Sequence, residues 1–274
     1  MSELRETDTF NAVVDNDHTA AFITEIHAAR YADVVFNPID NPSATEQLLE
    51  RRKQWAEDHS STVIFTSGVY DLFHPNHMAY LLHTKAAGAP VHYEKSRVAG
   101  DPSWEELSLE RIGTLTKAYI QSGALKQIVG IRGDASVAAT KGFRSDKGNS
   151  PRPIYDWDSR AVMMAHQTVP FQLSDGSWQF VPTVDAITSY GSEEFDANHP
   201  HHNLYSLTEA IQPDVWAIFG ESADILEKAP LIPSLGGVAL RRIIENGEDT
   251  AYYLDSYVGN FHTTAIIERI QQGK

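Results

Sequence analysis

The chain has 274 residues, of which 42% are hydrophobic and 22% are charged, and it contains no cysteine. The lack of cysteine excludes disulfides, thiolate metal sites and cysteine nucleophiles. A formal net charge of −15 argues against nucleic-acid binding, because contacts to a phosphate backbone need clustered Lys and Arg. No apolar run is long enough to span a membrane and the first residues lack a signal-peptide pattern, so we expect a cytoplasmic protein without a membrane partner.

Residues 1–60 are predicted to form an N-terminal helical extension. Asp17–Arg30 and Ser43–His59 have helix-forming composition, and the second begins with a capped pattern, S-A-T-E. Between them, Ala32–Pro42 combines a short apolar run with N-P-I-D-N-P, which is typical of a loop. We expect this extension to pack on the rest of the chain or on a second subunit.

The most informative stretch is Thr62–Leu82. It opens with a short β-branched run that ends at Gly68, as a buried parallel strand does when it enters a tight turn. Pro75 suits the first position of a helix, which places His74 at the N-cap and His77 at the third helical position. Both imidazoles should then lie on one side of the helix start, beside backbone N–H groups and the positive end of the helix dipole. This arrangement predicts a phosphate-binding site.

The helix from Pro75 is predicted to end near Gly88, where glycine and proline follow. Residues 89–126 are predicted to form a helical insertion, with a helix over Ser103–Gln121. The insertion could lie over the sheet edge or the substrate mouth. Substrate specificity and an oligomer contact stay open as its two roles.

The remaining chain alternates predicted strands and helices. The strands are short apolar segments bounded by turn residues: Gln127–Arg132, Thr183–Thr188, Asp214–Gly220 and Thr250–Leu254. Helices are predicted over Arg160–Gln167, Leu207–Gln212 and Leu240–Asn246. This order indicates an α/β class, with a Rossmann-like, doubly wound, parallel five-stranded sheet in a domain of residues 61–274. Ligands of such sheets bind at the carboxyl ends of the strands, where the strand order reverses.

The segment S-G-V-Y-D-L-F-H-P-N-H resembles the G-x-[FY]-D-x-x-H-x-G-H signature of the cytidylyltransferase-like nucleotidyltransferases. Asn76 stands where that family has a glycine, whereas five residues match: Gly68, Tyr70, Asp71, His74 and His77. The resemblance implies that the two histidines hold the α- and β-phosphates of a nucleotide. It also implies nucleotide contacts from Ser67, Gly68, Tyr70, Asp71 and Asn76.

A later stretch is similar to the sugar-phosphate adenylyltransferases that make nucleotide-activated heptose, a branch of the same superfamily. The order G-D-A-S-V-A-A-T-K-G, then R-P, then R-A-V-M-M carries this similarity, and it implies that Lys141 reaches the triphosphate. The earlier lysine of that pattern is Ala138 here, and Arg144 and Lys147 are nearby substitutes for its charge. Residues 142–152 would be either a lid over the nucleotide or a solvated surface loop.

Two further motifs lie towards the end of the chain. P-D-V-W-A-I-F-G resembles the family's P-D-[VI]-x-x-x-G-G-D, which implies a nucleotide contact at Gly220. G-N-F-H-T-T-A-I-I-E-R-I resembles its G-I-S-T-T-x-I-[IV]-x-R-I, which implies that Thr263 and Thr264 bind phosphate. His262 replaces the serine of that motif, and Tyr257 stands where several relatives carry an arginine.

The histidines of N-H-P-H-H-N at residues 198–203 lack the ordered spacing of metal ligands, and we predict no metal site held by the protein alone. Mg²⁺ is instead expected as the companion of a nucleoside triphosphate, held by phosphate oxygens. Asp71 would either assist that ion or fix the turn.

The resemblance implies transfer of a nucleoside monophosphate, from ATP before CTP, to a phosphorylated small molecule such as a sugar phosphate, with release of pyrophosphate. A cytidylyltransferase acting on a phosphorylated alcohol is one alternative. The other is a catalytically inactive, nucleotide-binding regulatory protein of the same fold, which the departures at Asn76, Ala138, Tyr257 and His262 favour. Both signature histidines and Lys141 favour an enzyme. The oligomeric state is open, and a homodimer is one option.

Overall fold

A parallel sheet lies at the centre of the molecule. The computed structural model describes residues 17–38, 41–59, 61–141, 152–191, 202–219 and 239–243, and every structural statement below concerns these ranges. The sheet has the order β1-β6-β3-β2-β7-β8, and all neighbouring strands run parallel. Its strands are β1 (Val35–Phe36), β2 (Thr62–Gly68), β3 (Leu125–Arg132), β6 (Ala186–Tyr190), β7 (Val215–Phe219) and β8 (Ala239–Ile243).

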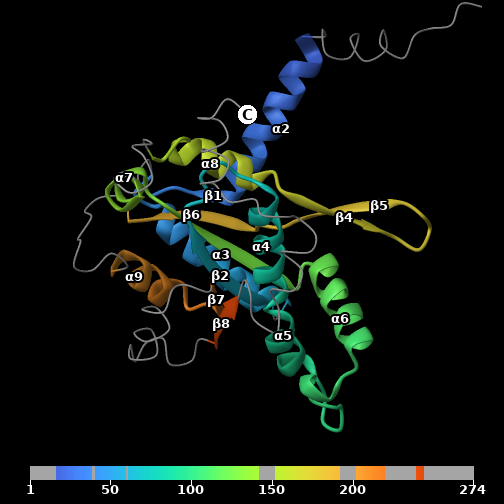
Figure 1. Cartoon of the computed structure of the whole chain (residues 1–274). Helices are drawn as coiled ribbons and strands as arrows, with labels where there is room; N and C mark the ends of the chain where they lie inside the picture. The colour runs from blue at the N-terminus through green and yellow to red at the C-terminus, as the bar shows by residue number, and fades with distance from the viewer. Residues whose placement is uncertain are drawn as a thin grey trace, which may run out of the picture.

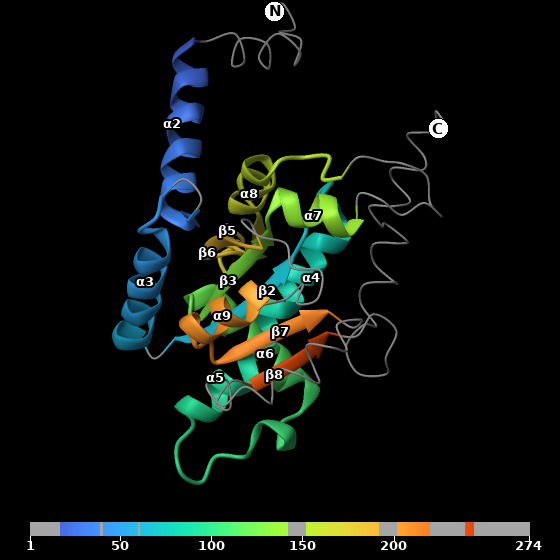
Figure 2. The same cartoon turned by 90° about the vertical axis from the view of Figure 1, so that its left-hand side faces the viewer.

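Helices cover both faces of this sheet (Figures 1 and 2). One apolar cluster joins α3 (Ala44–His59) and α9 (His202–Ile211) to strand residues that include Phe65 and Trp216. A second cluster joins α4 (Pro75–Ala86) and α8 (Trp157–Ala165) to the opposite side chains of β3 and β6. The doubly wound, parallel α/β fold predicted from the alternation of elements is therefore confirmed, although the described sheet has six strands instead of the predicted five.

The strand order reverses beside β2. The chain passes from β2 to β3 and on to β6, and then crosses to β7 on the other side of β2. The longest pairing in the sheet runs between β2 and β3, from Thr62 opposite Leu125 to Gly68 opposite Ile131. The carboxyl end of β2 is thus the switch point, where sheets of this kind bind their ligands.

The N-terminal extension is more closely joined to the sheet than predicted. Helix α2 (Asp17–Val34) is followed at once by β1, which pairs with β6, so the predicted loop over residues 32–42 is wrong for residues 32–36. The apolar run explains the difference, because Val34 and Phe36 are buried in the two core clusters. The Arg30 guanidinium also donates to the carbonyl oxygens of Ala165 and Val184.

The insertion at 89–126 forms α5 (Ala89–Ser96), a short 3₁₀ turn η1 (Trp104–Glu106) and α6 (Leu109–Ser122). The single helix predicted over Ser103–Gln121 is interrupted, because Ser108 caps a new helix by accepting from the backbone N–H of Arg111. In α5, His92 contacts Thr62 at the first residue of β2, and Lys95 pairs with Asp214 before β7. Helix α5 therefore lies at the amino ends of the strands, and of the two positions considered for the insertion the substrate mouth does not fit this helix.

Two strand assignments also differ from the prediction. A hairpin of β4 (Thr168–Gln172) and β5 (Trp178–Pro182) precedes β6, which begins at Ala186 rather than Thr183. Residues 239–243 form β8 beside β7, so the predicted helix over Leu240–Asn246 is wrong there. The predicted strand Thr250–Leu254 and the motif at 259–270 lie outside the described residues.

Candidate functional site

A tight turn joins β2 to α4 at the switch point. A Cβ atom added to Gly68 would come within 2.8 Å of the Tyr70 ring, so this ring packs directly on the glycine. Tyr70 and Leu72 adopt positive φ angles of 54° and 49°, which folds the chain back within a few residues. Any larger residue at position 68 would clash with the Tyr70 ring, so this position of the ring requires glycine.

His74 and His77 lie together at the start of α4. His74 is the N-cap, Pro75 is the first helical residue, and the His77 N–H donates to the His74 carbonyl over 2.9 Å. The two imidazole rings stack with their centroids 3.8 Å apart and their planes 20° from parallel. The prediction that both rings share one side of the helix start is confirmed.

Aromatic side chains support this pair of histidines. Tyr70 meets His77 edge-on at 5.4 Å, and Phe73 lies 5.5 Å from the same ring. Behind them, the hydroxyl groups of Tyr80 and Thr66 are 2.6 Å apart. Burial raises the pKa of Tyr70 and of Tyr80 well above the ordinary value, so both phenols stay neutral. The side chains that support the two histidines therefore carry no charge.

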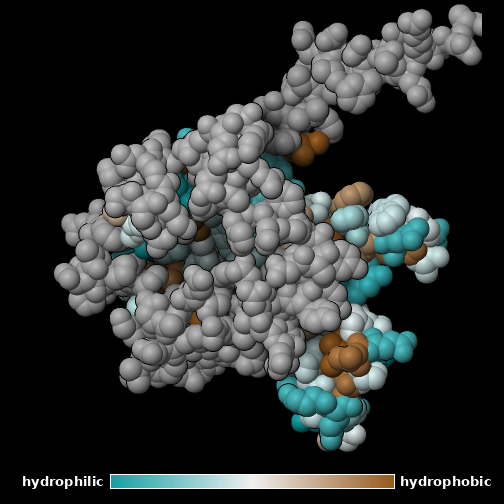
Figure 3. Space-filling view, in the orientation of Figure 1, coloured by the Kyte–Doolittle hydropathy of each residue, from teal (hydrophilic) through white to brown (hydrophobic). Residues whose placement is uncertain are grey.

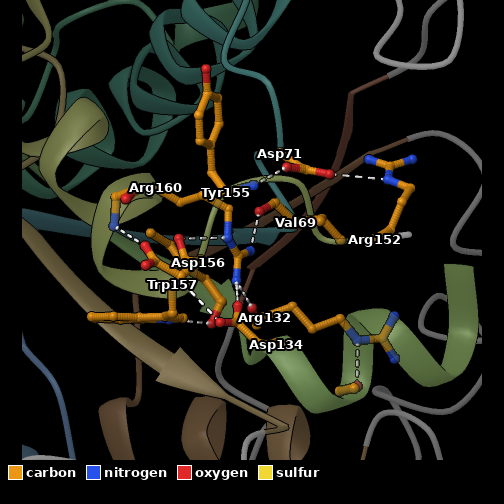
Figure 4. Close-up of polar contacts among 12 residues, drawn as sticks. Val69, Asp71, Arg132, Asp134, Arg152, Tyr155, Asp156, Trp157 and Arg160 are labelled. Carbon is orange, nitrogen blue, oxygen red and sulfur yellow. Dashed lines mark hydrogen bonds and ion pairs between the residues drawn. The ribbon is translucent and has the colours of Figure 1, made fainter. Parts of the chain in front are cut away.

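Asp71 anchors a segment that is distant in sequence (Figure 4). Its buried carboxylate accepts from Arg152 Nε at 3.0 Å and from the backbone N–H groups of Ile154 and Tyr155 at 3.0 and 3.1 Å. Both carboxylate oxygens are engaged by these donors. Of the two roles considered for Asp71, the geometry fits fixing the backbone and does not fit a magnesium ligand.

Arg160 connects the ends of β2 and β3 from within α8 (Figure 4). This fully buried guanidinium donates to the carbonyl oxygens of Val69 and of Arg132, and it pairs with Asp134. The other Asp134 oxygen accepts from the backbone N–H of Trp157 at 3.1 Å. Sequence reasoning gave Arg160 no role, although an arginine among apolar residues of a short helix is a signal for a buried contact.

The carboxyl ends of β3 and β6 add further polar side chains. Arg132 is 8% exposed, and its Nε donates to Ser136 Oγ over 2.8 Å. Burial raises the pKa of Tyr190, and the positive charge of Arg132 and a hydrogen bond with Ser67 oppose this rise. No sequence motif marks Arg132 or Tyr190 as part of the site. Ser67, predicted as a nucleotide contact, is directed towards Tyr190.

The structure thus brings together, at one turn, six of the predicted site residues: Gly68, Tyr70, Asp71, His74, Asn76 and His77. Lys141 is the last residue of α7 (Asp134–Lys141), and its side chain is not described. The other predicted site residues lie outside the described ranges: Arg144, Gly220, Thr263 and Thr264.

Within those ranges, no group of three or more His, Asp or Glu side chains is placed to hold a metal ion. Of the helices in the described part of the chain, none is both long and apolar enough to cross a membrane.

Comparisons with known proteins do not assign the chain to a family. No protein-family model and no curated protein matches the chain. Among solved structures, it is similar to a lipopolysaccharide core biosynthesis protein from Thermoplasma volcanium GSS1, with 17% identity and a TM-score of 0.35 over 66% of this chain and 95% of that one. The fold assignment rests on the strand order described above and not on this likeness.

Proposed function

We propose that this chain is a nucleotidyltransferase that transfers a nucleoside monophosphate from a nucleoside triphosphate, ATP foremost, to a phosphorylated small molecule. The observation that carries the proposal is the stacked pair of His74 and His77 at the start of α4. The pair lies at the switch point of a parallel sheet, where such folds bind nucleotides, and at a helix N-terminus, which favours phosphate groups.

The reaction needs little covalent chemistry from the protein. An oxygen of the acceptor phosphate attacks the α-phosphorus, the bond from that phosphorus to the bridging oxygen breaks, and pyrophosphate leaves with the electron pair. The acceptor phosphate is already ionised, so no general base is required. His74 and His77 donate to the α- and β-phosphates, and Lys141 neutralises charge on the leaving pyrophosphate. Catalysis then comes from positioning and charge stabilisation.

Local cations support an anionic substrate on a strongly acidic chain. Arg132, Arg152 and Arg160 converge near the ends of β2 and β3, although the formal net charge is −15. Asp71 and Asp134 neutralise two of these guanidinium groups. Arg132 is the last residue of β3, at the edge of the sheet where such folds bind ligands, and we assign it to substrate charge on the ground of this position.

The sugar phosphate is our proposed acceptor, because the order of motifs between residues 133 and 164 is similar to the heptose-type adenylyltransferases. A phosphorylated alcohol with CTP is the nearest alternative. Mg²⁺ supplies charge neutralisation when bound with the triphosphate, and the residues around the turn orient the phosphate groups.

The first test is pyrophosphate release by the full chain with Mg²⁺, each of ATP, CTP, GTP and UTP, and a panel of sugar phosphates and glycerol phosphate. His77→Asn should lower turnover about 10²–10³-fold, the scale for losing one preorganised donor to a charged transition state. His83→Asn is the matched control, because His83 lies further along α4. Equal rates for wild type and His77→Asn would contradict the mechanism.

A regulatory protein of this fold would bind a nucleotide without turning it over, so a binding measurement distinguishes it from the enzyme. A nucleotide present at 100 times its dissociation constant stabilises the folded protein by about 2.7 kcal/mol, which is visible as a raised melting temperature. Stabilisation of wild type that His77→Asn abolishes, with no pyrophosphate released for any acceptor, would favour a binding protein of the same fold.

A further inference from the structure

The pairing of β2 with β3 ends just before the residues assigned to substrate. The last pair of the ladder sets Gly68 opposite Ile131. Beyond it, the chain after β2 enters the turn of the histidine pair, and β3 ends at Arg132. Both groups assigned to substrate charge therefore lie past the last residue pair of this ladder. Their relative position has to be fixed by other contacts.

The Arg160 side chain makes such contacts at this point (Figure 4). Its guanidinium donates to the carbonyl oxygen of Val69, the first residue after β2. It also donates, over 2.8 Å, to the carbonyl oxygen of Arg132, the last residue of β3. One planar group thus joins the two strand ends where the ladder stops. Arginine suits this task, because its donors form a rigid fork, whereas lysine carries all of its donors on one nitrogen.

Arg160 is itself held by contacts at the start of α8. Its guanidinium pairs with Asp134, whose second carboxylate oxygen accepts from the backbone N–H of Trp157. The Trp157 indole N–H donates to the carbonyl oxygen of Ile131 over 3.2 Å. The start of α8 is therefore tied to the end of β3 and to the start of α7, and Arg160 extends from this fixed base.

The burial of Arg160 argues for a role beyond stability. Its side chain is 0% exposed, as are Ala161 and Met164 of the same helix. Removing an ion pair from water costs free energy that the attraction between the charges often fails to offset, so a buried pair is weak evidence for stability. The geometry that Arg160 imposes on the two carbonyl oxygens is the better explanation for a charged group at this place.

We propose that Arg160 is a positioning residue for nucleotide transfer, an inference that rests on the proposed function. It sets the distance between the turn that carries His74 and His77 and the side chain of Arg132. The partners of its guanidinium are protein oxygens, so it acts on the substrate only through these groups. Each half of the site still binds its ligand when the other half moves, so the loss of Arg160 should lower kcat and leave KM nearly unchanged.

Arg160→Met in the full chain tests the proposal, because methionine is unbranched and apolar and donates to neither carbonyl oxygen. The kcat for pyrophosphate release should fall about 10²-fold, the scale for a displacement of about 1 Å remote from the chemistry. KM for the nucleotide should change by less than about threefold. Arg160→Lys keeps the charge and loses the fork, so it should remain close to Arg160→Met. Recovery of the wild-type kcat by lysine would assign the effect to charge and overturn the proposal.

Two controls separate positioning from a loss of stability. Met164→Ala is matched to Arg160→Met, because Met164 is fully buried one turn further along α8. It should lower the melting temperature by leaving a cavity, with the kcat of the folded enzyme unchanged. Leu109→Ala is the surface control: Leu109 is 86% exposed at the start of α6, on the projection where Figure 3 shows hydrophobic residues at the surface. An equal fall of kcat for Met164→Ala and Arg160→Met would contradict a positioning role.

A double-mutant cycle asks whether Arg160 acts through Arg132. Arg132→Met alone should lower kcat/KM. In the Arg160→Met background the same substitution should cost at least about fivefold less, because Arg132 is already displaced there. Effects of the two substitutions that simply multiply would show that Arg160 acts independently of Arg132, which would overturn the proposal.

Hydrogen exchange measured by mass spectrometry tests the inference without any substrate. Peptides that cover residues 69–77 and 132–137 should both exchange faster in Arg160→Met than in wild type, and neither should do so in Leu109→Ala. A wild type that turns over no nucleotide would refute the proposed function, and the exchange rates would still decide whether Arg160 links the two segments. Unchanged exchange of both peptides in Arg160→Met would overturn the inference, whether or not the wild type is active.

Discussion

At the scale of single residues, the site depends on close packing between Gly68 and Tyr70. A methyl group at Gly68 meets ring atoms of Tyr70 at 2.8 Å, so Gly68→Ala should destabilise the fold by about 1–3 kcal/mol. Gly113→Ala is the control, because a Cβ at Gly113 meets nothing within 4 Å and alanine favours the α6 helix by about 1 kcal/mol. The urea concentration at the midpoint of unfolding should be lower than that of wild type for Gly68→Ala and higher for Gly113→Ala.

His92 makes stability depend on pH. Burial lowers the pKa of His92 below its ordinary value of 6.5, the nearby Lys95 lowers it further, and Asp214 opposes them. As the pH falls below about 6.5, His92 binds a proton in the unfolded chain before it does so in the folded protein. The free energy of unfolding therefore falls as the pH drops below that value. Urea midpoints at pH 7.5 and 5.5 should differ less for His92→Gln than for wild type. An equal difference would show that His92 is not the responsible group.

At the scale of elements, Asp71 ties the turn after β2 to residues 152–155. Asp71→Asn removes the charge that pairs with Arg152 and replaces one acceptor oxygen with a donor. We therefore expect the free energy of unfolding to fall by about 3–5 kcal/mol. Nucleotide turnover should fall with it, while the Mg²⁺ concentration that gives half-maximal rate should stay unchanged. A large rise in that concentration would instead make Asp71 a metal ligand. Arg152→Gln supplies the second arm of a double-mutant cycle with Asp71→Asn.

Local sequence signals explain which helices and strands could be predicted. Helix α4 was placed correctly because Pro75 and the residues before it mark a helix start. The hairpin was missed although S-D-G-S is a turn signal, because Pro170 and Pro182 obscure the strand pattern around it. Residues 239–243 contain helix formers, and only pairing with β7 makes them a strand. The pair of Arg160 and Asp134 joins residues that are far apart in sequence, so no local pattern reveals it.

At the scale of the whole molecule, the position of β2 in the middle of the sheet bears on synthesis of the chain. Strand β3, which pairs with one edge of β2, is complete at Arg132. Strand β7, which pairs with the other edge, begins only at Val215. At about 5–20 residues per second, a ribosome needs roughly 7–30 s to make the roughly 150 residues between β2 and β7. During this interval one edge of an apolar strand lacks its native neighbour, which is the kind of surface that recruits other chains into aggregates. Chains that end before Val215 should accordingly be insoluble, and slower translation after β6 should lower the yield of folded protein.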